Sequence, residues 1–328
     1  GIGILLVMIS HAHGLSGYLI NYYIPKSNKL NAYRKITTYK SKECELYNYH
    51  DKAIISLSKY LHQSDFAKAY IKGRSIITNA KAHKYNDVFI CLDIKDFFSS
   101  IRLEKLSNIL FYEINKNKTN CFTKKQCDEL VNSCTNSNVG LAIGLKPSPI
   151  LANIYLKEFD GLLYGKLKKF DLKNIIYTRY ADDITISYKQ CLSKTQKDLV
   201  NDEIVNIVEN LLRKYSLKLN RKNTRIIDLD VSNHVRITGI NITKDEEDFR
   251  KLTVGRKTKN EIYDKAIALL SNNNHDDIWH LEVQKLKGLQ SFVLSVEGTS
   301  YQKSYSDRMI SIIKEHGYDS LKEYIDSL

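Results

Sequence analysis

The distribution of apolar residues along the chain predicts a mixture of strands and helices. Residues 175–177 and 184–186 are rich in β-branched and aromatic side chains and flank a short polar segment, which indicates two strands joined as a hairpin. Residues 88–90 form an apolar run typical of a buried strand. Apolar residues recur at helical spacing in residues 51–66 and 195–216, so both segments are predicted to be helices. The pattern favours an α+β fold.

Weaker patterns extend this outline. Residues 100–135 are predicted to be helices separated by an Asn/Lys-rich loop. The Gly/Pro-containing residues 139–147 lead into a helix that starts at Ser148, and residues 258–328 are predicted to be helical. Two further strand pairs are predicted, one within residues 33–50 and one from residues 235–240 with residues 252–257.

The tip of the first hairpin carries two adjacent carboxylates, Asp182 and Asp183. Tight hairpin turns usually carry Asn-Gly or Asp-Gly, because the turn needs positive φ. Two like charges side by side are unfavourable unless a cation neutralises them. A third carboxylate, Asp93, follows the buried strand, and the three could gather around Mg²⁺, two of which commonly act together in phosphate chemistry. The alternative is a solvated turn whose acids bind nothing.

Composition and charge favour a polyanionic partner. The 328-residue chain has a formal net charge of +13, which suits nucleic acid or an acidic membrane. Its 22 tyrosines, interleaved with Lys and Arg, suit stacking on bases. A genome rich in A and T, whose codons favour Lys, Asn, Ile and Tyr, would account for part of this enrichment.

The cysteines and the N-terminal residues point to the cytoplasm. Six cysteines occur without a Cys-x-x-Cys pair, which is typical of free thiols in a reducing compartment. Residues 1–9 are apolar but too short to span a bilayer, and they lack the basic region and cleavage site of a signal peptide. We therefore expect a cytoplasmic protein without a membrane partner. His11 and His13 are assigned no role.

The sequence Tyr-Ala-Asp-Asp after a strand, with Asp-x-x-x-Phe-Phe about 90 residues before it, resembles the palm of a reverse transcriptase. The resemblance implies a right-hand polymerase fold with fingers, palm and thumb, the palm being an antiparallel sheet backed by helices. It also implies RNA-directed DNA synthesis by two-metal nucleotidyl transfer. The boundaries expected are residues 1–84 for the fingers and N-terminal region, 85–250 for the palm with interleaved fingers helices at about 100–145, and 251–328 for the thumb.

The resemblance assigns roles at the expected active site. Asp93, Asp182 and Asp183, together with Ile94, would hold two Mg²⁺ ions, for which Mn²⁺ could substitute. Lys222 would donate a proton to the leaving pyrophosphate, although Asn223 occupies the more usual lysine slot.

A second set of residues would bind the incoming dNTP. Phe98 would exclude a 2′-OH, and Gly144, Lys146 and Ser148 belong to the loop that positions template and nucleotide. This loop departs from the family at three positions, with Ala142, Ile143 and Lys146 where Pro, Gln and Pro are usual.

Two short motifs resemble retron reverse transcriptases in particular. Asn79-Ala80-x-x-His83 precedes the first aspartate, and Ile237-Thr238-Gly239 approximates a Val-Thr-Gly triplet. A retron enzyme would use a structured noncoding RNA as template and primer, would hold an RNA–DNA duplex product, and would act in anti-phage defence with an effector protein or second subunit. The residues expected to contact nucleic acid are Lys72, Arg74, Asn79, His83, Thr238, Gly255, Arg256 and Lys257.

Other functions stay open at this point. A different defence reverse transcriptase would make repetitive or weakly templated DNA. Two departures from the family favour it: Ile143 replaces the usual Gln, and the basic residue usual in the second strand of the pair within residues 33–50 is replaced near Glu43. A catalytically silent RNA-binding module is disfavoured by the three carboxylates. Group II intron and diversity-generating enzymes are further candidates, and the absence of accessory domains disfavours the former.

Overall fold

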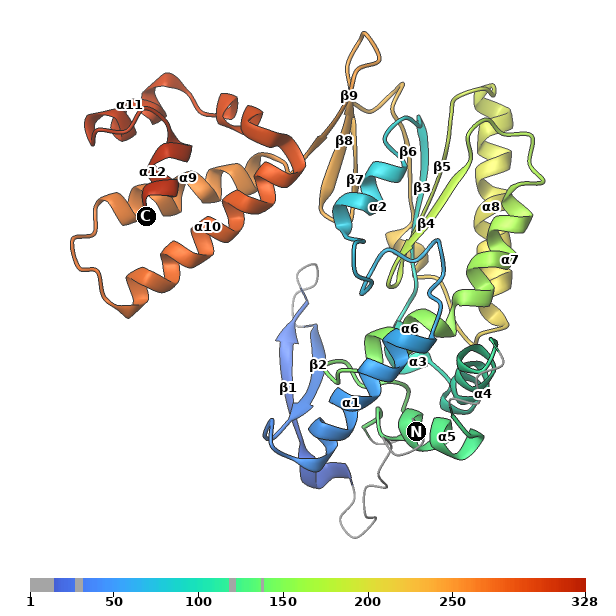
Figure 1. Cartoon of the computed structure of the whole chain (residues 1–328). Coiled ribbons are helices and arrows are strands. Elements are labelled where there is room, and N and C mark those ends of the chain that lie inside the picture. Colours follow the sequence, from blue (N-terminus) through green and yellow to red (C-terminus); the bar gives the residue numbers. More distant parts are fainter. Residues whose placement is uncertain (1–14, 27–31, 118–121, 137–138) are drawn as a thin grey trace. The chain divides into compact units, whose positions relative to one another are not determined.

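The computed structural model describes residues 15–26, 32–117, 122–136 and 139–328 (Figure 1). The chain forms two compact units. The first contains the chain up to Ser75 together with Val88–Ile226, and the second contains Ile76–Asp87 together with Ile227–Leu328. His11 and His13, to which the sequence assigns no role, and the apolar segment 1–9 lie outside the described residues.

A four-stranded sheet forms the centre of the first unit, in the order β4-β5-β3-β6. Its strands are β3 (Val88–Asp93), β4 (Ile176–Tyr180), β5 (Asp183–Tyr188) and β6 (Arg225–Asp228), the last crossing the boundary between the units. β5 pairs antiparallel with both β3 and β4. Residues 88–92 of β3 are all buried, which explains why this strand appears in the sequence as a continuous apolar run. The predicted hairpin and the predicted buried strand are confirmed.

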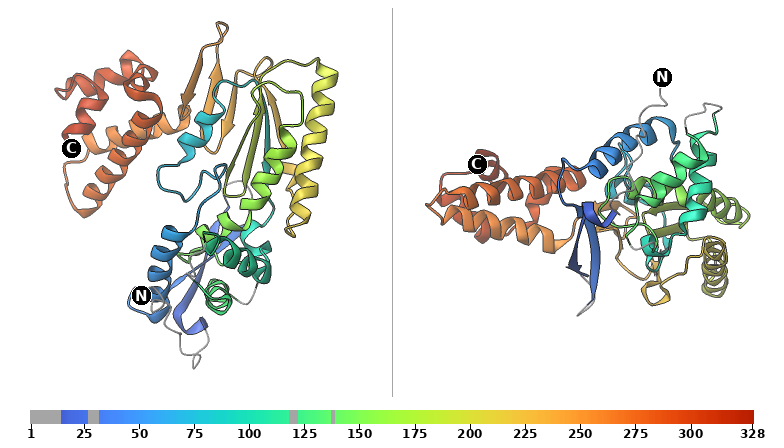
Figure 2. Two further views of the ribbon diagram at one scale, coloured as in Figure 1. Left: turned by 45° about the vertical axis from the view of Figure 1, so that its right-hand side comes forward. Right: turned by 90° about the horizontal axis from the view of Figure 1, so that it is seen from below.

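Two helices pack on this sheet, α7 (Lys157–Leu167) and α8 (Lys194–Arg213) (Figure 1). The Tyr188 hydroxyl on β5 donates to Asn201 Oδ1 on α8 over 2.6 Å. The predicted helix at 195–216 is confirmed, and its start is fixed by a capping box in which Ser193 and Gln196 bond each other's backbone. Two further views of the ribbon show the same strands and helices (Figure 2).

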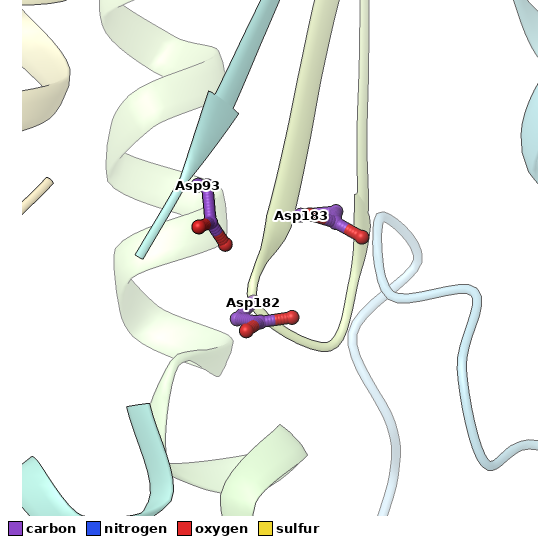
Figure 3. Close-up of side chains that lie close together, drawn as sticks. All are labelled: Asp93, Asp182 and Asp183. Carbon is purple, nitrogen blue, oxygen red and sulfur yellow. The ribbon is translucent and has the colours of Figure 1, made fainter. Parts of the chain in front are cut away.

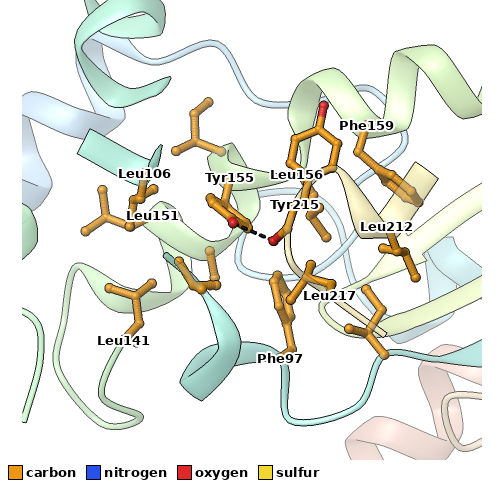
Figure 4. Close-up of a cluster of buried hydrophobic side chains, with 14 of the residues drawn as sticks. Phe97, Leu106, Leu141, Leu151, Tyr155, Leu156, Phe159, Leu212, Tyr215 and Leu217 are labelled. Carbon is orange, nitrogen blue, oxygen red and sulfur yellow. Dashed lines mark hydrogen bonds between the residues drawn. The ribbon is translucent and has the colours of Figure 1, made fainter. Parts of the chain in front are cut away.

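The remaining helices of the first unit enclose one hydrophobic core. They are α1 (Glu45–Tyr60), α3 (Phe97–Ser100), α4 (Leu103–Ile114), α5 (Lys124–Asn132) and α6 (Ser148–Tyr155). Figure 4 shows part of this core, where Phe97, Leu151 and Leu217 pack around Tyr155. The Tyr155 hydroxyl donates to the Tyr215 carbonyl over 2.6 Å, so the one polar atom of this ring is satisfied. The predicted helices within residues 100–135 and the helix at Ser148 are confirmed.

The strand pair predicted within residues 33–50 is wrong in its partner. β2 (Tyr33–Tyr39) pairs antiparallel with the preceding β1 (Leu19–Pro25), which follows the short helix η1 (Leu15–Tyr18). The residues after β2 form α1 instead, because Cys44 caps it, accepting from the Tyr47 N–H, and the apolar residues that follow have helical spacing. The helix predicted at 51–66 therefore exists but begins earlier, at Glu45.

The sheet of the second unit has the order β7-β8-β9, and α2 (Ile76–Ala82) contacts it. Its strands are β7 (His234–Ile237), β8 (Ile240–Lys244) and β9 (Arg250–Thr253). The hairpin predicted from residues 235–240 and 252–257 is wrong, because residues 235–240 are not one strand. Thr238 and Gly239 have φ of 46° and 88° and reverse the chain between β7 and β8, and it is β8 that pairs with β9.

Helices complete the second unit and have a separate core. They are α9 (Arg256–Leu270), α10 (Asp277–Glu297), η3 (Gly298–Ser304), α11 (Asp307–Glu315) and α12 (Leu321–Ser327). Buried Ile262, Leu286 and Tyr301 belong to this core. The predicted helical character of residues 258–328 is confirmed. Among the residues described, no helix has both the length and the apolar character to span a bilayer.

Candidate active site

Asp93, Asp182 and Asp183 lie together at one end of the first unit's sheet (Figure 3). Asp93 is the last residue of β3, Asp183 is the first of β5, and the two are opposite each other in the antiparallel register. Asp182 lies in the turn between β4 and β5. Carboxylate oxygens of the three residues lie within 4.8 Å of one another. The sequence prediction that these three carboxylates gather is therefore met by the fold.

The backbone of the turn positions Asp182. Ala181 has φ of 55°, a left-handed conformation that is rare for a residue with a side chain. The carbonyl of Asp182 accepts from the Ile94 N–H over 2.9 Å, which ties the turn to the end of β3. Ile94, predicted as a metal ligand, is thus joined to the turn by its N–H, while its side chain is buried.

The carboxylates repel one another. Burial, with the charge of Asp93 next, raises the pKa of Asp182 to about 6. Burial, with the charges of Asp182 and Asp93 next, raises the pKa of Asp183 to about 7. The charges of Arg34 and Arg179 lower the pKa of Asp182, and the charge of Arg225 lowers that of Asp183, but these effects are smaller than those of burial and of the neighbouring carboxylates. An all-oxygen cluster of this charge suits a hard divalent cation, which would neutralise it.

The short helix η2 (Arg221–Asn223) lies beside Asp93. The Asn223 side-chain amide donates to Asp93 Oδ2 over 3.1 Å, and the Asn220 N–H donates to the Asp93 carbonyl over 2.8 Å. Lys222, the predicted proton donor, is exposed on the same helix. Asn223 was not predicted as a site residue, although its place in the usual lysine slot was the signal that could have identified it.

The residues predicted to bind the nucleotide have different surroundings. Phe98 is half-buried and packs edge to face against Phe97, with 5.6 Å between the ring centroids. Gly144 has φ of 111°, and a Cβ there would overlap the Thr37 carbonyl, so a glycine is required by the approach of β2. Ser148 is buried, and its hydroxyl has no hydrogen-bond partner among the described residues.

Lys146 is engaged on the surface of the first unit. Its Nζ pairs with Asp51 Oδ1 at 2.6 Å and lies 4.2 Å from the centroid of the Tyr47 ring. Its backbone N–H donates to the Tyr39 hydroxyl over 2.9 Å, which ties the loop to β2. In this conformation the ammonium is held by the protein itself.

The two retron-like motifs meet in the second unit. The buried Asn79 amide on α2 donates to the Thr238 hydroxyl over 3.1 Å. Thr238 lies in the β7–β8 turn with φ of 46°, which is unfavourable for a β-branched residue. The amide thus holds a strained turn, and the nearby His83 is fully buried. Both motifs therefore have a structural role, whatever else they contact.

The other residues predicted to contact nucleic acid divide into exposed and enclosed side chains. Lys72, Arg256 and Lys257 are exposed. Arg74 is half-buried, and its Nη1 donates to the carbonyls of Ser64 and Ala67, so it holds a loop together. Gly255, predicted in a basic turn, is the residue before α9, and Arg256 and Lys257 are in the first turn of that helix.

Comparison with known proteins agrees with this site. The model of the family "Reverse transcriptase (RNA-dependent DNA polymerase)" matches residues 24–284. The retron Ec83 reverse transcriptase of Escherichia coli is 27% identical over 274 residues, covering 79% of this chain and 80% of that protein. The retron Ec73 reverse transcriptase of Escherichia coli is 31% identical over 180 residues, covering 48% of this chain and 57% of that protein.

Among solved structures, telomerase from Candida albicans in complex with a TWJ fragment of telomeric RNA aligns with 94% of this chain and 65% of its own. The TM-score is 0.49 at 12% identity, so the assignment does not depend on this likeness.

The family match covers most of the chain and includes the strands that bear the three carboxylates. The antiparallel sheet with its covering helices has the architecture of a polymerase palm. The chain therefore belongs to the reverse transcriptase family, is of the retron type, and is an RNA-directed DNA polymerase with the α+β right-hand polymerase fold.

Proposed function

We propose that this polymerase copies a dedicated structured noncoding RNA, which also supplies the primer, into DNA in anti-phage defence. The observation that carries the catalytic part is the cluster of three carboxylates within 4.8 Å of one another. The similarity to retron reverse transcriptases supports the choice of template. An effector protein or second defence subunit would act on the product or with it.

Asp93, Asp182 and Asp183 would hold two Mg²⁺ ions. Such ions, when bound, lower the pKa of the primer hydroxyl and neutralise charge on the triphosphate and leaving group. Asn223 orients the Asp93 carboxylate by donating to it, and the Ile94 N–H fixes the turn that bears Asp182. Lys222 would supply the proton for the pyrophosphate. Phe98, half-buried beside Phe97, would exclude a 2′-OH and so select dNTPs.

The proposed division of the chain follows the polymerase plan. Residues 1–84 would form the fingers and N-terminal region, residues 85–250 the palm, and residues 251–328 the thumb. The exposed cations Lys72, Arg256 and Lys257 would contact phosphates of the template–primer duplex, and its binding should then weaken steeply with salt.

A second candidate function is synthesis of repetitive or weakly templated DNA. Ile143 favours it, because the usual glutamine of the nucleotide-positioning loop is absent. The ion pair of Lys146 with Asp51 also leaves this loop without a free ammonium for a phosphate.

Sequencing of the RNA and DNA that co-purify with the protein tests the proposal. The protein would be expressed from its native locus as wild type and as Asp183→Asn. One abundant small RNA with complementary DNA that disappears in Asp183→Asn is the expected result. Repetitive DNA without a matching RNA would transfer support to the second function. RNA without DNA in both samples would contradict both.

A further inference from the structure

Arg179 lies inside the first unit, on the strand that leads to the catalytic turn. Its side chain is fully buried, and its Nε and Nη2 donate to Asp160 Oδ1 and Oδ2 on α7 over 2.8 and 2.9 Å. The Tyr177 hydroxyl donates to the same Oδ1 over 2.6 Å. Tyr177 and Arg179 are two residues apart on β4, so both face α7. The Asp160 charge is therefore fully compensated within the protein.

The guanidinium also donates to backbone carbonyls beyond Asp160. Its Nη1 donates to the Ala181 carbonyl over 3.1 Å, and its Nη2 donates to the Asn153 carbonyl on α6 over 3.3 Å. Ala181 is the residue with φ of 55° that precedes Asp182. The Ala181 carbonyl belongs to the same rigid peptide plane as the Asp182 N–H. The bond from Arg179 therefore sets the orientation of the peptide from which Asp182 begins.

The turn is fixed on its other side by β3. The Asp182 carbonyl accepts from the Ile94 N–H, and Asp183 pairs with Asp93. Asp182 thus lies between two peptide planes that are each bonded to a different part of the unit. An ion pair that served only to neutralise Asp160 would need just the two nitrogens that contact it. The third nitrogen, Nη1, contacts the turn.

We propose that Arg179, held in place by Asp160, is a positioning residue for the catalytic turn and raises the affinity of the three carboxylates for divalent cations. This inference rests on the metal site of the proposed function and extends it into the protein interior. The alternative is that the buried pair contributes to folding alone.

Arg179→Lys separates these roles, and Tyr177→Phe is its matched control. Lysine keeps the positive charge beside Asp160 but lacks the planar fork needed to contact Asp160 and Ala181 together. Tyr177→Phe removes a hydrogen bond to the same carboxylate and leaves the bond to Ala181 intact. For each metal-free protein we would measure Mn²⁺ binding from the EPR signal of free Mn²⁺, with Asp183→Asn as the background, and thermal unfolding in EDTA.

We expect Arg179→Lys to bind Mn²⁺ about 10- to 100-fold more weakly than wild type, the usual effect of losing an outer partner of metal ligands. Tyr177→Phe should lower the Tm and leave Mn²⁺ affinity unchanged. Wild-type affinity in Arg179→Lys would overturn the positioning role and leave the proposed function standing. Wild-type protein that binds no more Mn²⁺ than Asp183→Asn would overturn both.

Should Arg179→Lys show no cooperative unfolding, the double variant Arg179→Met, Asp160→Leu would replace it, since exchanging both members of a buried pair for apolar residues commonly preserves folding. Weak Mn²⁺ binding by the folded double variant would support the proposal. Binding at the wild-type level would overturn it.

Discussion

Asp160 and the pair Asp182–Asp183 belong to the same unit but have opposite surroundings. Asp160 is fully buried, and its two oxygens accept from Arg179 and Tyr177. Asp182 and Asp183 are half-buried and lie close to Asp93, and the charges of Arg34, Arg179 and Arg225 only partly offset the rise in their pKa values. The chain thus neutralises Asp160 with a two-nitrogen contact from Arg179, whereas the pKa values of Asp182 and Asp183 stay raised despite the arginines near them. The first stabilises the protein, and the others retain capacity to bind a cation from solution.

The largest effects should come from neutralising one carboxylate of each kind. Asp183→Asn should lower DNA synthesis about a thousandfold, because a ligand for the charge-stabilising ions is lost. It should not lower the free energy of unfolding, since it relieves repulsion from Asp182 and Asp93. Asp160→Asn should lower that free energy by about 3–5 kcal/mol, because Arg179 would be buried without its counter-ion. Primer extension and urea unfolding of both variants would measure this, and equal destabilisation by the two would break the comparison.

The adjacent phenylalanines extend the comparison to apolar side chains. Phe97 is 3% exposed and belongs to the core, whereas Phe98 is half-buried. Phe98→Ala should raise incorporation of NTPs relative to dNTPs by about 10- to 100-fold, because the space for a 2′-OH opens. Phe97→Ala should instead cost about 3–5 kcal/mol of stability. Competition assays with matched dNTP and NTP would decide, and unchanged sugar selectivity in Phe98→Ala would rule out its role.

The metal-free protein should lose stability as the pH rises from about 4 to about 7. The folded-state pKa values of Asp182 and Asp183, about 6 and about 7, lie above the ordinary value of 3.8. In this window the folded protein binds more protons than the unfolded chain, so the free energy of unfolding falls with increasing pH. The Tm in EDTA should fall by several degrees across the window.

Two controls accompany this pH dependence. Mg²⁺ should raise the Tm more at pH 7 than at pH 5, because cations bind only the deprotonated carboxylates. Asp183→Asn should show a smaller pH dependence in EDTA than wild type. The same slope in both proteins would assign the effect to other groups.

The smallest effect should come from Tyr177→Phe. Removal of one hydrogen bond to a carboxylate that keeps both bonds from Arg179 should cost about 1–2 kcal/mol. DNA synthesis at saturating Mg²⁺ should match wild type. A clear loss of DNA synthesis in the folded Tyr177→Phe protein would show that the Tyr177–Asp160 hydrogen bond also helps to position the catalytic turn.

Sequence patterns predicted well where one rule dominated locally. The buried strand at Val88, the hairpin bearing Asp182 and Asp183, and the long helix at Lys194 follow from the spacing of apolar and β-branched residues. The prediction failed where neighbouring patterns compete. Alternation after Tyr33 gives no indication that the partner strand precedes it, and the strand predicted through Thr238 is broken by two positive φ angles.

The candidate site shows the same limit. The three carboxylates are identifiable because each follows a strand signal. Asn223 and Arg179 depend on contacts that are distant in sequence or hidden in the interior, since an arginine in a strand is usually an exposed residue. No local sequence pattern indicates that Nη1 of Arg179 contacts the turn at Ala181.

The helix α2 has a consequence for how the protein is made. It belongs to the second unit, although residues 88–226 of the first unit follow it in the chain. Its Asn79 bonds Thr238, 159 residues later. On the ribosome, α2 emerges long before β7 and β8, so its buried face stays without a partner until most of the chain is synthesised. The late closure of this long segment should make the second unit the slower to fold and leave incomplete nascent chains exposed to proteases and chaperones.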